Sequence, residues 1–209
     1  MEYKCDIAGV EYGMDDIFSA TITQPLFEKL SVGNACSAEL KIRFVPKETV
    51  PRMARIVPSA RKSSEDEWKQ LGVFYTDTRT VTGKLMEITA YDDMLKAEQV
   101  WVPRQDLEFP ETGLPMSDAV TEIAHLMDVP VDSRTALNAA YGIDYPSNDY
   151  TLRDVLRYIA AAHGGNWIIT SDGKLLLVPL FGGMPPETNY LVAENGDAIT
   201  FGGVRISLG

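Results

Sequence analysis

Two pairs of adjacent aspartates are the residues of this chain best suited to acid–base chemistry. They are Asp15–Asp16 and Asp92–Asp93. A glycosidase needs two carboxyl groups on opposite sides of a cleft, and neighbours in sequence do not provide that arrangement by themselves. We therefore interpret the first pair as part of a turn. We interpret the second pair as the start of a helical segment, because acidic side chains are favoured at the positive end of a helix.

The sequence contains no set of metal ligands or nucleophiles with a recognisable spacing. Its two histidines are His125 and His163, and neither H-E-x-x-H nor paired C-x-x-C occurs. His163 falls in the last turn of an expected helix, where the helix dipole explains it, and we expect His125 at the surface or in an interface. The motif G-x-S-x-G is also missing. We therefore predict no catalytic, cofactor-binding or metal site, and no enzyme.

Three tryptophans, Trp68, Trp101 and Trp167, leave a second function open. Exposed together on one face they would form a platform for sugars, whereas buried indoles anchor a core or an interface. The alternative function is therefore a β-rich carbohydrate- or protein-binding module, which predicts at least two exposed tryptophans on one face. A hydrolase with dispersed acids is less favoured and predicts a cleft with two carboxyl groups of different pKa.

The composition limits the partners of the chain. Its 209 residues carry a net charge of −11, which argues against nucleic acid, because phosphate binding needs clustered Lys and Arg. The charge argues equally against an anionic membrane surface. No apolar stretch approaches the ~18 residues that span a bilayer, and the first ten residues lack the pattern of a signal peptide.

One local group of basic residues faces either solvent or the acidic surface of a neighbouring subunit: Arg52, Arg55, Arg61 and Lys62.

The two cysteines, Cys5 and Cys36, fit a reducing compartment. A disulfide between them is one option. The favoured interpretation makes Cys36 a small, buried apolar residue.

A strict alternation of apolar and polar residues predicts β-strands in the first part of the chain. It is clearest from Cys36 to Phe44, where a period of two places apolar side chains on one face and charges on the other. Ile17 to Thr23 alternates likewise, with Phe18, Ala20 and Ile22 expected on one face. Further strands are expected at 52–57, 68–76 and 83–91, with 78–82 between the last two. Several short strands separated by turns predict an antiparallel β-barrel or sandwich; an open sheet covered by a later part of the chain is the other option.

The pattern changes to helices after residue 91. Ser117 is a candidate N-cap for a short helix that Pro130 ends. Thr151 caps a second helix, with Asp154 placed three residues on as in a capping box. Ser171–Gly173 then joins two strands, because Asp-Gly is favoured in a two-residue type I′ turn. We therefore predict an α+β, mainly β fold, with an N-terminal antiparallel β-barrel or sandwich followed by a small helix-plus-hairpin α/β domain.

The segment from Thr151 to Leu180, TLRDVLRYIAAAHGGNWIITSDGKLLLVPL, resembles the baseplate hub or tail-tip proteins of tailed phages and prophages. In that family a capped helix leads into a strand with G-x-W and then a D-G-K hairpin. Two earlier stretches agree in the same order, Gly33 to Leu40, and Leu71 to Tyr75 followed by Ile88 to Asp92. The helix from Ser117 to Met127 has the matching register D-A-V-x-x-I-A.

This resemblance, which extends over residues 17–180, implies a structural protein of the virion, located in the phage tail and synthesised in the bacterial cytoplasm. We assign a hub-like β-barrel domain to 1–96, a small α/β domain to 97–182 and a C-terminal β segment to 183–209. The last segment is too short for a complete second barrel, so either it starts a truncated second barrel or the chain is a shorter relative of the family. The family implies a homotrimer that docks to tail tube and spike proteins, and this departure from the family leaves the trimer open. No cofactor, nucleic acid or membrane partner is expected.

Overall fold

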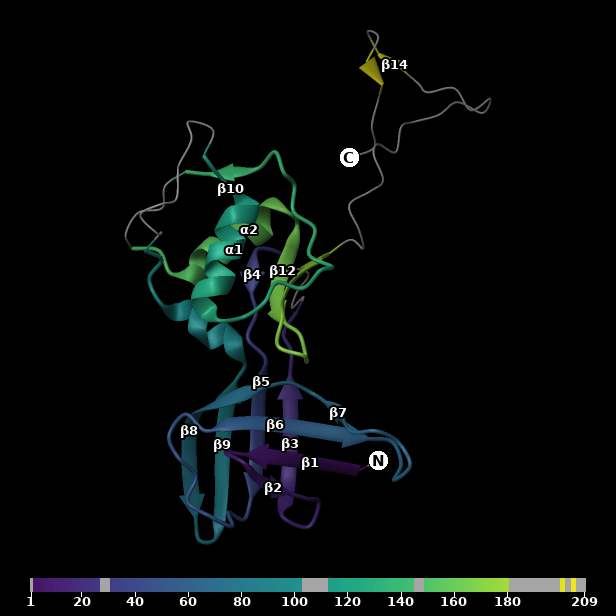
Figure 1. Cartoon of the computed structure of the whole chain (residues 1–209), viewed down its shortest axis with the longest axis vertical. Coiled ribbons are helices and arrows are strands. Elements are labelled where there is room, and N and C mark those ends of the chain that lie inside the picture. The colour runs from purple at the N-terminus through teal and green to yellow at the C-terminus, as the bar shows by residue number, and fades with distance from the viewer. Residues whose placement is uncertain are drawn as a thin grey trace.

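Strands with one apolar face build the first part of the fold. The structure is a computed structural model that describes residues 2–26, 31–102, 113–144 and 149–180, with the backbone of 200–201 and 204–205. An eight-stranded antiparallel sheet has the spatial order β2 (Val10–Tyr12), β1 (Glu2–Ile7), β6 (Arg55–Arg61), β8 (Phe74–Thr82), β9 (Leu85–Tyr91), β5 (Glu39–Phe44) and β3 (Ile17–Thr23), with β7 (Lys69–Gln70) beside β6. In Figure 1, β1 and β6 cross the direction of β3, β5 and β9, so the sheet folds over itself into two layers.

The alternation that predicted the central strand is confirmed. Leu40, Ile42 and Phe44 are fully buried between the two layers, whereas Lys41 and Arg43 on the opposite face are exposed. Burial of one such apolar side chain contributes about 1.5–3 kcal/mol to stability. The inner face of β5 is therefore a main source of stability for this barrel-like unit.

The strand predicted at Cys36–Phe44 is shorter than expected. β5 begins at Glu39, and the chain before it crosses to a second unit, where Asn34–Ala35 forms β4 in a different sheet. Cys36 is nevertheless buried, as predicted, and both Cys36 and Cys5 are free thiols. The disulfide that the sequence left open is therefore not formed.

Three strand predictions and one side-chain orientation differ from the structure. The strand expected at 68–76 is broken, because β7 ends at Gln70 and β8 begins at Phe74. β6 covers Arg55–Arg61 rather than residues 52–57, and residues 78–82, expected between two strands, belong to β8. Threonines in that stretch favour the extended conformation, which explains the longer strand. β3 has the predicted bounds, but Phe18 is 64% exposed instead of facing the core. A bulge at this point, where the register with β5 shifts, turns the side chain outward.

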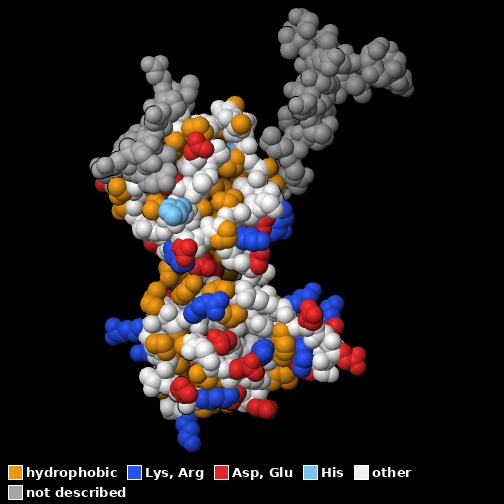
Figure 2. All heavy atoms as spheres, in the orientation of Figure 1, with side chains coloured by type: hydrophobic (Ala, Val, Ile, Leu, Met, Phe, Trp, Pro, Cys, Tyr) orange, Lys and Arg blue, Asp and Glu red, His pale blue; other side chains and the backbone are white. Residues whose placement is uncertain are grey.

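The second unit packs two helices against a three-stranded sheet. The helices are α1 (Met116–Met127) and α2 (Leu152–Ala162), and the sheet has the order β13 (Leu175–Pro179), β12 (Gly165–Ile169), β4. The 3-10 helix η2 (Asp93–Glu98) and the short strands β10 (Leu114–Pro115) and β11 (Gly142–Ile143) complete this α/β unit. Figure 2 shows the two units as two lobes joined by a narrower waist. The predicted α+β, mainly β fold class is confirmed.

The two helices start in different ways. Thr151 Oγ1 accepts a hydrogen bond from the Asp154 N–H (3.1 Å), and the Asp154 carboxylate accepts one from the Thr151 N–H (3.1 Å), so the predicted capping box is complete. The N-cap predicted at Ser117 is wrong, because α1 begins one residue earlier at Met116. Pro115 precedes the helix instead, and its missing N–H costs nothing at a helix start.

The loop of the β12–β13 hairpin has the predicted residues but not the predicted turn type. The Thr170 N–H donates to the backbone oxygen of Lys174 (2.8 Å), which leaves the three residues Ser171–Gly173 in the loop. Gly173 has a φ of +78°, a conformation that glycine adopts without strain. The prediction of a two-residue turn is therefore wrong, although its residues are the ones that reverse the chain.

The C-terminal segment is described in part. β14 (Thr200–Phe201) pairs antiparallel with β15 (Val204–Arg205). The rest of the β segment expected at 183–209 lies outside the described residues. Within the described ranges, no helix is long and apolar enough to cross a membrane.

Thr151→Ala tests the capping box. This change removes the Oγ1 acceptor of the Asp154 N–H, so we expect the free energy of unfolding to fall by about 1 kcal/mol. Urea denaturation followed by circular dichroism measures it. Thr151→Ser keeps the hydroxyl and should remain close to the wild type; an equal loss in both variants would show that the lost methyl contact, not the cap, is responsible.

Candidate functional site

One arginine ties the helical unit to the chain segments that connect it with the barrel unit. The guanidinium of Arg153 on α2 donates to the backbone oxygen of Ala35 (2.8 Å) and to Oγ of Ser37 (2.9 Å). It also donates to the backbone oxygen of Met94 (3.0 Å) and forms an ion pair with Glu98 (2.7 Å). Ala35 and Ser37 lie where the chain crosses into β5, and Met94 lies where it leaves β9. Arg153 therefore holds both crossings against α2.

A buried carboxylate joins the same two crossings to each other. Asp92 Oδ2 accepts from the Ala38 N–H (2.8 Å) and Oδ1 accepts from the Met94 N–H (3.1 Å). Asp92 is the N-cap of η2, so the predicted helix start is confirmed. Its side chain is only 3% exposed, and burial raises its pKa to about 7 although the two N–H groups and Arg153 act to lower it. We call Asp92, Arg153 and their hydrogen-bond partners the junction.

Backbone hydrogen bonds extend the junction into the sheet of the α/β unit. The Cys36 N–H donates to the backbone oxygen of Trp167 (2.8 Å), and the Gly33 N–H donates to that of Gly165 (2.8 Å). Gly33 has a φ of +83°, and a Cβ at this position would lie 3.0 Å from the Cβ of Ala161 on α2. A glycine is therefore required for β4 to enter this sheet so close to the helix.

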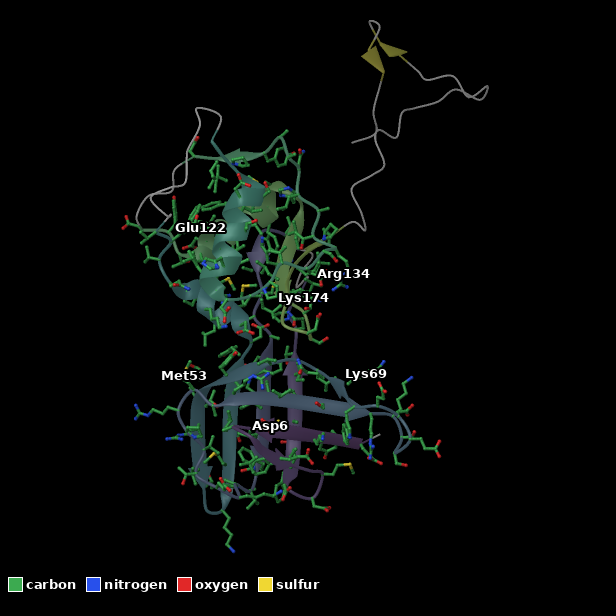
Figure 3. All side chains as sticks on the ribbon, viewed as in Figure 1. Asp6, Met53, Lys69, Glu122, Arg134 and Lys174 are labelled. Carbon is green, nitrogen blue, oxygen red and sulfur yellow. The ribbon has the colours of Figure 1, made fainter. Side chains whose placement is uncertain are left out.

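A second, smaller contact links the two units away from the junction. Gln70 Nε2 on β7 donates to the backbone oxygen of Ser171 in the β12–β13 loop (2.7 Å). Figure 3 labels Lys69, which precedes Gln70 on β7, and Lys174, which follows the hairpin loop. Two separate contacts resist rotation of one unit against the other better than a single one does.

The first aspartate pair forms a turn, as predicted. Asp16 Oδ2 accepts from the Gly13 N–H (3.0 Å), and the hydrogen bond from Lys47 (2.6 Å) keeps the pKa of Asp16 below its usual value. The Val45 N–H at the end of β5 donates to the backbone oxygen of Asp16, whereas Asp92 binds at the start of β5. The six residues of β5 separate the two aspartate pairs by about 20 Å. This separation exceeds the distance between the carboxyl groups of a glycosidase.

Both histidines occupy structural or surface positions. His163 ends α2, where its Nε2 accepts from the Asn138 N–H (2.9 Å) and its Nδ1 lies 2.8 Å from the backbone oxygen of Ile159. These two hydrogen bonds hold the His163 ring in place, so they explain its position in place of the charge–dipole interaction that the sequence suggested. His125 is exposed on α1, as expected. Among the described residues, no group of three or more His, Cys, Asp or Glu could hold a metal ion.

The tryptophans do not form a sugar platform. Trp101 and Trp167 are buried in the α/β unit, at 1% and 0% exposure. The Trp101 Nε1–H points to the Glu122 carboxylate on α1 (3.3 Å), which Figure 3 labels. Because only Trp68 of the three reaches the surface, the requirement for two exposed tryptophans on one face fails.

The local basic group is partly neutralised within the chain. Arg61 forms an ion pair with Glu2, with 2.7 Å between Nε and Oε2. Arg61 and Lys4 also lie over the ring of Trp68, at 4.5 and 4.9 Å from its centre. Such contacts of a cation with an aromatic face are worth about 0.5–1 kcal/mol at exposed sites. Arg52, Arg55 and Lys62 of the group are exposed.

Sequence reasoning missed the role of Arg153. The residue occupies a polar position of an amphipathic helix, where an arginine usually contacts solvent, so the pattern contains no signal for its partners. The partners lie 59 to 118 positions away in the chain. The signal for Asp92 was seen, but only as a local cap.

Arg153→Met tests the junction. The change leaves the oxygens of Ala35, Ser37 and Met94 without their charged donor, so we expect the free energy of unfolding to fall by about 2–4 kcal/mol. Arg157→Met is the matched control on the same helix, since Arg157 is half exposed with one long ion-pair distance of 3.8 Å to Asp154. Arg157→Met should lower the free energy of unfolding by less than about 0.5 kcal/mol. Similar losses for both variants in urea denaturation would contradict the role of Arg153.

Asp92→Asn tests the buried carboxylate through pH. The unfolded Asp92 loses its proton near 3.8 and the folded one near pH 7, so between these values the folded protein binds the extra proton and its stability falls as pH rises. Relative to that of Asp92→Asn, the free energy of unfolding of the wild type should therefore fall by up to about 4 kcal/mol between pH 4 and 7, at about 1.4 kcal/mol per pKa unit. Chemical denaturation of both proteins across this range measures the difference. A difference that stays constant with pH would contradict the raised pKa.

Two solved structures share this architecture over most of the chain. The 43 kDa tail protein of prophage MuSo2 from Shewanella oneidensis matches 85% of this chain with a TM-score of 0.61 at 11% sequence identity. The tail protein from Neisseria meningitidis MC58 matches 84% of it with a TM-score of 0.56 at 16% identity. No family model and no curated protein matches the chain.

The similarity is one of fold. The matched part makes up 54% and 49% of the two solved chains, so this chain spans about half of their length. At such low identity a structural match establishes shared architecture, and function has to be argued from the site. This chain therefore has the fold of one half of two tail proteins, one of them from a prophage.

Proposed function

We propose that this protein is a structural component of a phage or prophage tail, acting in the virion at the baseplate hub or tail tip. The observation that carries the proposal is the fold similarity to two tail proteins, because 84–85% coverage of this chain includes both of its units. The order of sequence motifs that resembles hub proteins supports the finer assignment to the hub or tip.

The junction supports a role that depends on shape. Arg153 and Asp92 both bind the two chain crossings, and the contact of Gln70 with Ser171 adds a second point of attachment. Two units fixed in this way present their outer surfaces at a constant angle and spacing. A subunit of a symmetric assembly needs this property, because its contacts have to close around an axis.

The side chains that could act as catalytic acids or bases support a structural role instead. Both oxygens of Asp92 and both ring nitrogens of His163 are engaged by backbone groups of the fold. A catalytic acid or base has to come within hydrogen-bond distance of a substrate atom, and Asp92 is almost completely buried. These side chains stabilise the structure.

The proposed partners are further copies of this chain, arranged as a homotrimer, together with tail tube and spike proteins. The net charge of −11 favours protein partners over nucleic acid or an anionic membrane. A threefold ring joins two different surfaces of each copy head to tail, and the two-lobed shape in Figure 2 offers such different surfaces on its two units.

The trimer is tested by light scattering after gel filtration. We expect a mass of about 69 kDa, three times the 23.1 kDa of one chain. Loading concentrations about a hundredfold apart show whether mass action shifts the equilibrium, as it does for a weak assembly. A mass of one chain at the highest concentration would contradict self-assembly of this chain.

A further inference from the structure

A groove opens in the barrel-like unit between β1 and β3. Its volume is about 470 Å³, and its walls come from β1, β3, β5 and β6. Leu40 and Ile42 of β5 form its fully buried floor, and Ala20 and Ile22 of β3 form one wall. Burial in this apolar setting raises the pKa of the Cys5 thiol on the opposite wall to about 12. The groove thus lies over the inner face of the sheet, and its accessible apolar side chains include Ala20 and Ile22 on the β3 wall.

The strand beside the groove has one unpaired edge. β3 pairs with β5 on one side from Ile17 to Thr23, and no strand in the described part of the chain pairs with its other side. Natural sheets protect a long free edge with charged residues or proline. β3 has seven residues, Ile-Phe-Ser-Ala-Thr-Ile-Thr, with neither. An uncharged edge next to an apolar groove is suited to accept one more strand.

The chain itself contains a segment with the matching pattern. In Val204–Leu208, the apolar residues Val204, Ile206 and Leu208 alternate with Arg205 and Ser207. A strand of this pattern has one apolar face and one polar face. β15 within it pairs with β14 through two residue pairs, and an isolated two-stranded hairpin is at best marginally stable in water. The segment therefore gains stability from a further sheet edge.

The segment is long enough to reach the groove. Leu71 lines the groove, and its neighbour Gln70 bonds to Ser171 in the α/β unit. Leu180 lies within about 30 Å of Ser171, because only nine residues separate them. The 24 residues from Leu180 to Val204 can span up to about 80 Å, which exceeds the distance that they have to cover. Figure 1 draws β14 away from the barrel, so occupation of the groove requires this hairpin to move.

We propose that Val204–Leu208 adds to the free edge of β3 as an extra strand and places Val204, Ile206 and Leu208 in the groove between β1 and β3. The added strand completes the first barrel of this chain rather than starting a second one. The apolar groove supplies the binding energy and the backbone of β3 supplies the register. The proposal concerns one copy of the chain and does not depend on the role in a phage tail.

Amide hydrogen exchange of the full chain tests this proposal. Ile206→Lys places a charge in the apolar groove, so we expect the β3 amides between Ser19 and Thr23 that point away from β5 to exchange at least about tenfold faster than in the wild type. Ser207→Lys is the matched control on the polar face and should leave these rates within about twofold. Equal rates in the wild type and Ile206→Lys would overturn the proposal.

Dilution distinguishes the two occupants of the groove that could protect β3, the chain's own segment and a second copy of the chain. Protection by the chain's own segment stays the same when the protein concentration is lowered about a hundredfold, because the contact is intramolecular. Loss of protection on dilution would show that a second copy fills the groove and would overturn the proposal. The mass measured in solution is a separate quantity, so a monomeric protein with a protected β3 supports this inference while it contradicts the trimer.

Discussion

A buried charge is stable only when hydrogen bonds replace the water it has lost, and the relative position of the two units depends on how this chain meets that requirement. Arg153 has a planar donor group, and the backbone oxygens of Ala35 and Met94 with the hydroxyl of Ser37 surround it. Asp92 lies at the same crossings and accepts from two N–H groups. Since each group bonds to both chain crossings, a shift of one unit against the other would break several hydrogen bonds at once. The two lobes are therefore held in one arrangement by polar contacts at a narrow waist.

Local patterns predicted most of the elements, because they depend on forces that act within a few residues. The period of two in β5 and the capping box of α2 belong to this class, and both are present as expected. The outward turn of Phe18 was not predictable, because a bulge is set by the register with a partner strand. β4 was missed for a similar reason, since its two residues pair with a strand more than 130 positions later in the chain. Periodicity shows which face of an element is apolar, but it does not show which partner covers that face.

The candidate site shows the same limit for polar residues. The sequence singled out Asp92 as a helix start, which is correct, but its bond to Ala38 depends on the fold. A carboxyl group with a pKa of about 7 suits proton transfer at neutral pH, and a raised pKa is often used to find active sites. Here the shift has another origin, because burial at a structural joint raises the pKa without any access for a substrate. Exposure separates the two cases, and exposure cannot be read from the sequence at this position.

The two ends of the eight-stranded sheet differ in a way that bears on assembly. β2, at one end, has only three residues, and its Glu11 is charged and paired with Lys4, so this edge offers little to a foreign strand. β3, at the other end, is long and uncharged and borders an apolar groove. An edge of this kind promotes aggregation when it stays open, so a sequence that protects one edge and leaves the other bare fits a protein in which the bare edge is covered. The contrast between β2 and β3 therefore identifies the side of the barrel at which the structure is completed.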